Sequence, residues 1–422
     1  MTIKEHIEKL KAERGDKSFA FLAERCETSD DNPYRIRPAA PLQPDEVAVV
    51  MLCGAGTRGV DHIREYNGYL KQVDEFIKNS PKLRHKKTRV VVAICNFGKY
   101  HDPKVARHLQ HMEYVDYESF RKEISKLSAE EREEILNPVY IQDIFNQTVL
   151  PRLSTDGKHP HSLRRTLGFV RKVNFVTHCH GGYVALSLEK MLNKKMTSLG
   201  FNGDEQSQIV SQFLSLNYAP DSAKHSAEST FITFQSAQDN HIKDKTFFEE
   251  WLLMKRKDFG LSFLPKNGNV FTCAQVDKSG IEGNPPRVWI AKEIGDFFDE
   301  RANAIKEANK NDWQDPEEEK IAGEHSFLGF KPKSNMSKGA LKMQSLANNI
   351  LENAVVNSHQ QSLYNPVPLP SIQSLAANNS DERMDLAKAK LKGYKLNLEC
   401  AFASDNKVIQ YKTWRVNHTI EI

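Results

Sequence analysis

The chain has 422 residues, of which 39% are hydrophobic and 27% are charged, so it can build a sizeable core and is not a globally disordered chain. Its 59 basic and 55 acidic residues give a net charge of only +4. So balanced a composition gives no reason to expect a nucleic-acid partner, and we predict none. The six cysteines form no CxxC pair, which argues against a zinc ribbon or a thioredoxin motif.

The location of the protein is predicted from segments that the sequence lacks. The N-terminal residues have no apolar segment of the kind found in a Sec signal peptide, and no stretch approaches the about 18 apolar residues of a membrane span. We therefore expect a cytoplasmic protein in a reducing compartment, although specialised secretion into another cell would need no Sec signal either. The densest basic run, 82–89, is expected to be a solvated loop, with an anion or membrane-surface contact as the alternative.

Residues 1–45 are expected to form an N-terminal helix followed by an arm. Ile3, Ile7 and Leu10 fall on one face of the predicted helix. The segment from Glu27 to Pro44 is polar and contains prolines, so we expect it to cover the edge of the core or to extend from it as an arm.

Residues 46–360 are predicted to form an α/β core. Residues 47–53 are a continuous apolar run, which is typical of a strand buried in a parallel sheet. A glycine loop, a helix over about 60–78 and an apolar strand over 89–95 complete a βαβ unit. Further along the chain, strands are predicted at 212–218, 230–235 and 269–276, and a helix at 337–356.

Two regions are predicted to be additions to this core. Residues 97–170 are polar and mostly helical, and too long for a simple crossover, so they should contain an insertion or lid. Residues 361–422 should form a linker and a small α+β extension, a helix and then a hairpin of strands at 395–401 and 408–416. The predicted fold class is α/β, with a mostly parallel central sheet, helices on both faces, a helical insertion and this C-terminal extension.

A cysteine lies at the turn between a predicted strand, 173–178, and a predicted helix that follows it. The sequence Thr177-His178-Cys179-His180-Gly181 has the form small-x-nucleophile-x-small, which a sharp strand-to-helix turn requires because the flanking positions are crowded. The start of a helix also favours a thiolate. We therefore predict that Cys179 is a nucleophile; the alternative is a structural cysteine.

With this turn and this order of elements, residues 47–356 resemble the α/β-hydrolase superfamily, specifically its lipase/esterase-like members with a His-nucleophile-His-Gly-Gly elbow. Those members usually carry serine as the nucleophile, whereas this chain carries Cys179, as do some relatives such as the dienelactone hydrolases. The resemblance implies a triad in the order nucleophile, acid, histidine. It places the acid at Asp239, with Asp221 as the alternative, and the base at His325.

The same resemblance implies an oxyanion hole made by backbone N–H groups. One donor would be His180, directly after the nucleophile, and the other would be Gly54 or Ala55, in the loop after the first core strand. Neither a cofactor nor a metal is predicted. The Gly54–Gly56 loop lacks the Walker ending of a phosphate loop. A metal site made by the histidines at 159, 161, 178 and 180 is a weaker alternative, because no carboxylate motif accompanies them.

These residues predict a hydrolase or acyltransferase that uses a Cys179 thioacyl intermediate. Its substrate would be an ester, a thioester or a lipid acyl group, carried by a small molecule, a lipid or a protein. One alternative is a cysteine peptidase or amidase, with the same triad or, in a version that resembles the caspase-like clan, with a His180-Gly181 dyad and Cys273 as the nucleophile. Another alternative is a non-catalytic effector or binding module on a hydrolase scaffold.

Overall fold

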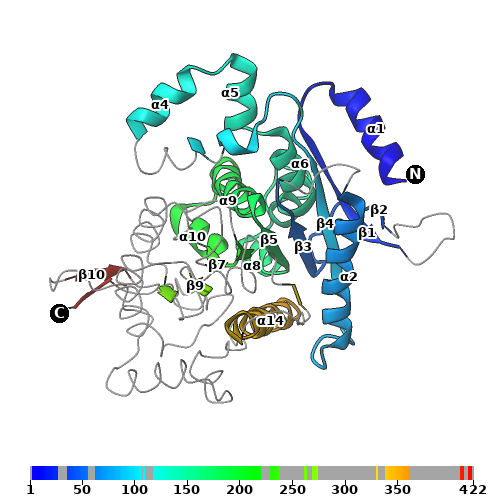
Figure 1. The fold of residues 1–422 in the computed structure, drawn as a ribbon. Coiled ribbons are helices and arrows are strands. Elements are labelled where there is room, and N and C mark those ends of the chain that lie inside the picture. Colours follow the sequence, from blue (N-terminus) through cyan, green and yellow to red (C-terminus); the bar gives the residue numbers. More distant parts are fainter. Residues whose placement is uncertain are drawn as a thin grey trace. The chain divides into compact units, whose positions relative to one another are not determined.

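The computed structural model describes residues 2–26, 36–55, 62–106, 108–109, 117–219, 229–236, 261–263, 269–273, 329–330, 338–360, 409–412 and 417–420. The chain divides into two compact units, which we describe separately: Met1–Gln206 with Pro220–Lys224, and Ser207–Ala219 with His225–Ile422. Both units contain helices and strands, so the predicted α/β class is confirmed (Figure 1).

The sheet of the first unit has the strand order β2-β1-β4-β3-β5. Its strands are β1 (Phe19–Arg25), β2 (Ile36–Pro38), β3 (Ala48–Leu52), β4 (Arg89–Asn96) and β5 (Val173–His178). The strand β3 pairs parallel with both β4 and β5, whereas β1 pairs antiparallel with β4 and with β2. The predicted strands at 47–53, 89–95 and 173–178 are therefore confirmed, within a sheet that is mixed.

All five residues of β3 are apolar, and all five are buried. Burial on both faces explains why this strand reads as a continuous apolar run rather than as an alternating one. Asn174, in β5, is a polar residue that is fully buried. Its side-chain Nδ2 donates a hydrogen bond of 3.0 Å to the carbonyl oxygen of Ala48, which satisfies an amide that would otherwise be costly to bury.

Strands β1 and β2 were not predicted; they lie within the region expected to be a helix and an arm. The helix α1 (Ile3–Arg14) is present, and it buries Ile3 and Ile7 as expected. Beside β1, the side chains of Asp143 and Gln147 accept hydrogen bonds from the backbone N–H groups of Ala20 and Leu22. Gln147 also donates to the carbonyl oxygen of Ala20. These bonds satisfy backbone groups of β1 that strand pairing leaves open.

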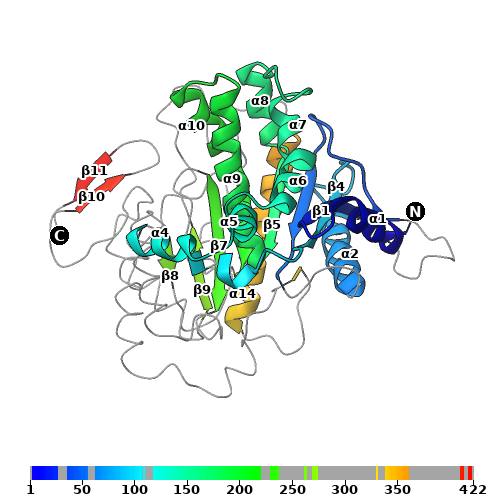
Figure 2. The ribbon, with the colours of Figure 1, turned by 90° about the horizontal axis from the view of Figure 1, so that it is seen from above.

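The helices of the first unit that follow α1 include the predicted one at 60–78 and several within 97–170. They are α2 (Ile63–Asn79), α4 (Tyr117–Ser125), α5 (Ala129–Leu136), α6 (Val139–Thr148), α7 (Leu150–Leu153), α8 (Leu163–Val170) and α9 (His180–Ser198). Helices α6 and α9 pack against each other, and both also contact the sheet (Figure 2). Part of the predicted insertion, α6, thus belongs to the layer that covers the sheet. None of the described helices is long and apolar enough to cross a membrane.

The second unit contains a run of four hydrogen-bonded strands and a long helix. The strands β6 (Leu214–Tyr218), β7 (Thr230–Ser236), β9 (Asn269–Cys273) and β8 (Leu261–Phe263) follow each other in that order. Only the pair of β6 and β7 is parallel among them. The helix α14 (Lys338–Ser358) contacts β9, so the predicted helix at 337–356 is confirmed. Helix α10 (Gly203–Ser211) spans the division between the units.

The described residues of the C-terminal extension form two strands. Strand β10 (Ile409–Lys412) pairs antiparallel with β11 (Asn417–Ile420). Strand β10 lies within the strand expected at 408–416. The strand expected at 395–401 lies outside the described residues, so its pairing stays a prediction.

Candidate active site

Cys179 occupies a strained backbone position between β5 and α9. Its φ of 53° and ψ of −121° differ from those of the strand before it and the helix after it. Among the described residues only Cys179 and Ala219 combine a side chain other than glycine's with a positive φ. Such strain costs about 1–3 kcal/mol and persists only where the surrounding structure enforces it. The predicted strand, sharp turn and helix are all present.

Two glycines allow this turn to pack against the end of β3. A Cβ atom on Gly181 would lie 2.2 Å from the carbonyl oxygen of Leu52, which is backbone and cannot move aside easily. Thr177 is the register partner of the same Leu52. The crowding predicted for the positions two before and two after Cys179 therefore takes place around Leu52.

The second glycine, Gly54, lies directly across from the cysteine. A Cβ atom on Gly54 would lie 2.8 Å from the Cβ of Cys179, 3.3 Å from its Sγ and 3.6 Å from the Nδ1 of His178. The absence of a side chain at Gly54 thus lets the loop after β3 pass close to both Cys179 and His178. Cys179 is 8% exposed, so its surroundings are mostly protein.

Of the predicted oxyanion-hole residues, Gly54 and His180 lie next to Cys179. His180 is the first residue of the 19-residue helix α9, where backbone N–H groups have no intrahelical partner and the helix dipole favours negative charge. Gly54 follows β3 directly and faces Cys179, and Ala55 comes next in the chain. This arrangement can stabilise a thiolate and an oxyanion at the same place.

The side chain of His180 belongs to a buried hydrogen-bonded chain that the sequence did not suggest. The hydroxyl of Tyr140, in α6, lies 2.9 Å from the Nε2 of His180 and 3.3 Å from the Nε2 of His101. The Nδ1 of His101 lies 3.0 Å from the carbonyl oxygen of Glu134. Phe97 packs edge-on against the Tyr140 and His180 rings, with centroid separations of 5.1 and 5.3 Å.

The positions of the hydrogens in this series of hydrogen bonds follow from the bond between His101 and Glu134. A carbonyl oxygen only accepts, so the Nδ1 of His101 must carry the hydrogen that it donates to Glu134. Burial lowers the pKa of His101, so its ring is neutral and its Nε2 accepts a hydrogen bond. The hydroxyl of Tyr140 therefore donates a hydrogen bond to the Nε2 of His101 and accepts one from the Nε2–H of His180. The imidazole of His180 is thus hydrogen-bonded to Tyr140.

Replacing Tyr140 by phenylalanine is expected to lower the free energy of unfolding by about 1–3 kcal/mol, because it leaves buried imidazole nitrogens without the bonds that the hydroxyl makes. Urea denaturation measures this loss. The matched control is Tyr117→Phe, since Tyr117 is 62% exposed and should change stability by less than about 0.5 kcal/mol. Equal stability of the two variants would contradict the hydrogen-bonded chain.

Stability is expected to fall as the pH drops below about 6.5, the pKa of histidine in an unfolded chain. Burial lowers the pKa of His101 in the folded state, so the unfolded chain binds that proton more readily and acid favours unfolding. Urea titrations at several pH values should show a flatter profile for His101→Asn, whose amide can still donate to Glu134. An unchanged slope in this variant would show that His101 does not carry the effect.

The other members of the predicted triad lie outside the described residues. Asp239, the alternative acid Asp221 and the base His325 all fall in parts of the chain that the structure does not describe. The structure therefore brings Gly54 next to Cys179, and both the oxyanion hole and the triad stay predictions.

Cys273 and the four histidines of the alternative metal site all lie within the described residues. Cys273 is the last residue of β9, in the second unit. The Nδ1 of His159 lies 2.6 Å from the Oδ2 of Asp156, and the Nε2 of His161 lies 3.2 Å from the carbonyl oxygen of Pro151. Within the described part of the chain, no group of three or more His, Cys, Asp or Glu side chains could hold a metal ion.

Comparison with known proteins adds no family assignment. No protein-family model matches the chain, and no curated protein matches it significantly.

Proposed function

We propose that this chain is a hydrolase or acyltransferase of the α/β-hydrolase type that forms a thioacyl intermediate on Cys179. The substrate would be an ester, a thioester or a lipid acyl group. The observation that carries the proposal is the backbone of Cys179, held at a φ of 53° at a strand-to-helix turn that packs closely against Gly54. A buried structural cysteine would need neither the strain nor the glycine opposite its sulfur.

The proposed reaction uses Cys179 with the predicted acid, base and oxyanion-hole donors. The Cys179 thiolate attacks the acyl carbonyl carbon, and the carbonyl oxygen becomes an oxyanion that accepts hydrogen bonds from the backbone N–H of His180 and of Gly54 or Ala55. Collapse of this intermediate breaks the bond to the leaving group and leaves a thioester on Cys179. His325, oriented by Asp239, takes the thiol proton and gives it to the leaving group. Water or an acceptor then attacks the thioester and releases free thiol.

A cysteine peptidase or amidase with the same triad would use the same elbow on an amide bond. The caspase-like version is less well supported, because His180 is the first residue of the long helix α9 and its ring is bonded to Tyr140. A free catalytic imidazole in a loop would be needed instead. A non-catalytic binding module would keep the elbow but form no acyl intermediate.

The experiment is to trap the acyl-enzyme. The protein is mixed with an activated ester such as p-nitrophenyl butyrate and quenched in acid within seconds, and the intact mass and peptide masses are measured. We expect one butyryl group on Cys179 that neutral hydroxylamine removes, and no such adduct on Cys179→Ala. Ester consumption without any adduct on Cys179, or no consumption at all, would contradict the proposal.

A further inference from the structure

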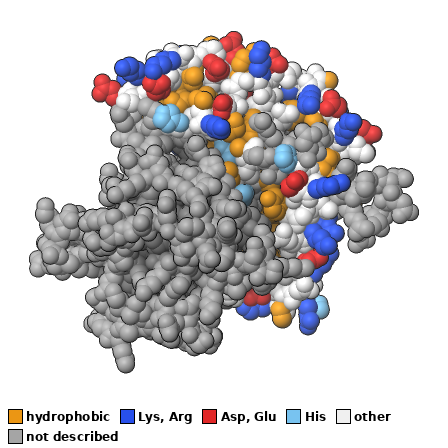
Figure 3. Space-filling view, viewed as in Figure 1, with side chains coloured by type: hydrophobic (Ala, Val, Ile, Leu, Met, Phe, Trp, Pro, Cys, Tyr) orange, Lys and Arg blue, Asp and Glu red, His pale blue; other side chains and the backbone are white. Residues whose placement is uncertain are grey.

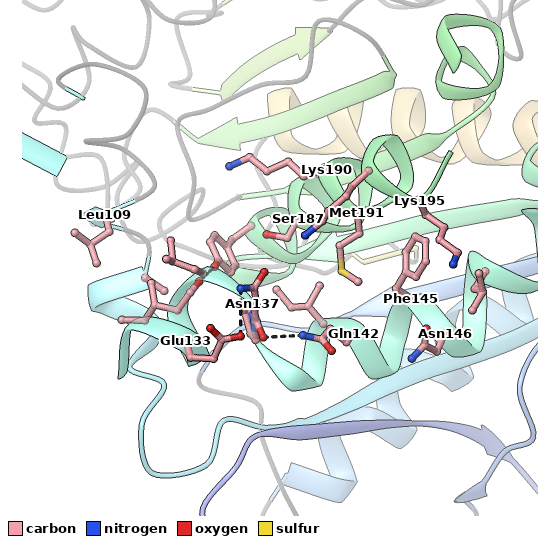
Figure 4. A pocket seen from close by; sticks show the side chains of 18 of the residues that line it. Leu109, Glu133, Asn137, Gln142, Phe145, Asn146, Ser187, Lys190, Met191 and Lys195 are labelled. Carbon is pink, nitrogen blue, oxygen red and sulfur yellow. Dashed lines mark hydrogen bonds between the residues drawn. The ribbon is translucent and has the colours of Figure 1, made fainter. Parts of the chain in front are cut away.

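A pocket of about 750 Å³ lies in the first unit, along one side of α9 (Figure 4). Helices α5 and α6 and residues just before α4 and within it form its other walls. Its volume falls within the about 300–1,000 Å³ that is usual for sites that bind small molecules. The pocket therefore has the size for a small ligand rather than for a folded partner.

The two ends of this pocket differ in chemistry. One end, next to the first turns of α9, is lined by Leu109, Phe120, Ile135 and Tyr183. On the face seen in Figure 3, hydrophobic side chains gather over α4 and α5, and Leu136, which also lines the pocket, is 49% exposed. Exposed apolar surface of this kind marks a place where an apolar group can bind.

The other end carries Lys194 and Lys195, three turns further along α9, and a third lining lysine, Lys190, lies between the two ends. Twelve residues separate Tyr183 from Lys195, which corresponds to about 18 Å along the helix axis. Neither Lys194 nor Lys195 forms an ion pair with any residue that the structure describes. Glu133 is the acidic side chain among the described lining residues, and it accepts a hydrogen bond from Asn137.

We propose that this pocket binds a single-chain anionic amphiphile, with its apolar chain beside Tyr183 and its carboxylate or phosphate head at Lys194 and Lys195. An apolar end and an uncompensated cationic end about 18 Å apart match a molecule that has the same two parts at a similar separation. This proposal does not depend on the chemistry of Cys179. A partner helix is less suitable, because it would need a longer and more apolar groove.

The direct test is the binding of a fluorescent long-chain carboxylate, cis-parinaric acid, to the full-length protein below its critical micelle concentration. We expect saturable binding to one site that weakens as the salt concentration rises. Dodecanoate should displace the probe, and dodecanol and butyrate should do so about tenfold less well or worse, because each lacks one of the two parts. Lysophosphatidic acid is compared with dodecanoate; stronger displacement by one of them identifies a lipid phosphate or a free carboxylate as the preferred head. Non-saturable binding, or equal displacement by dodecanol and dodecanoate, would overturn the proposal.

Two variants locate the site. The double substitution Lys194→Glu with Lys195→Glu should weaken probe binding about tenfold or more, whereas the control Lys4→Glu with Lys9→Glu, at exposed lysines of α1, should not change it. Ser187→Trp, which fills the middle of the pocket, should also remove binding while the urea denaturation midpoint stays unchanged. Full binding by both pocket variants would place the ligand elsewhere and refute the assignment. The Cys179→Ala variant should bind cis-parinaric acid as the wild type does. This result would separate the pocket from the proposed reaction at Cys179.

Discussion

Replacing Cys179 by alanine is expected to reduce the turnover of an activated ester by about a thousandfold or more while the protein stays folded. The loss is large because no other described side chain is placed to form the covalent bond. The fold should persist because alanine keeps the Cβ atom, so the backbone at a φ of 53° is no more strained than before. Initial rates with p-nitrophenyl butyrate, together with circular dichroism, measure both quantities.

The control for this variant is Cys26→Ala. Cys26 is a half-buried cysteine directly after β1, and its replacement should leave the turnover unchanged. If Cys179→Ala and Cys26→Ala have the same rate, Cys179 is not the nucleophile. The hydrolysis would then come from another site or from a contaminant.

Replacing Gly181 by alanine is expected to lower the free energy of unfolding by about 3 kcal/mol or more. The new Cβ atom would lie 2.2 Å from the carbonyl oxygen of Leu52 and 2.8 Å from its carbonyl carbon, so either α9 or β3 must move. Movement of α9 would also carry the backbone N–H of His180 away from Cys179. Urea denaturation measures the loss of stability, and ester turnover should fall as well.

The matched control is Gly168→Ala, in α8. No atom lies within 4 Å of the Cβ position at Gly168, so this change should raise the free energy of unfolding by about 0.5–1 kcal/mol through helix propensity alone. Opposite signs for the two glycine variants are therefore expected. A Gly181→Ala protein as stable as the wild type would contradict the close packing of the elbow on β3.

The parts of the fold that could be predicted are those determined by local sequence. Strands β3 and β4 are apolar runs, and the elbow from β5 to α9 follows from a short motif whose spacing has a steric cause. The need for a small residue at Gly181 was also visible in this motif. Its contact with Leu52 was not, because that residue belongs to a strand more than a hundred positions earlier.

The parts that could not be predicted depend on distant residues. Strand β1 is held by pairing with β4 and by side chains of α6, more than a hundred positions later in the chain. Tyr140 lies 39 and 40 positions from the two histidines that it joins, so no spacing pattern reveals the chain that they form. The density of aromatic and charged residues between 101 and 136 was a signal that this region does more than cross over, but it named no partners.

The most direct test of the central claim is the rate at which each cysteine reacts with iodoacetamide in the native protein at neutral pH, mapped by peptide mass spectrometry. Burial raises the pKa of Cys53 and of Cys95, to about 12 for Cys95, so both should react slowly. Cys179, at the start of α9 and opposite Gly54, should react faster than free glutathione. If Cys179 instead reacts as slowly as Cys95, or if Cys273 is the fast cysteine, Cys179 is not an activated nucleophile.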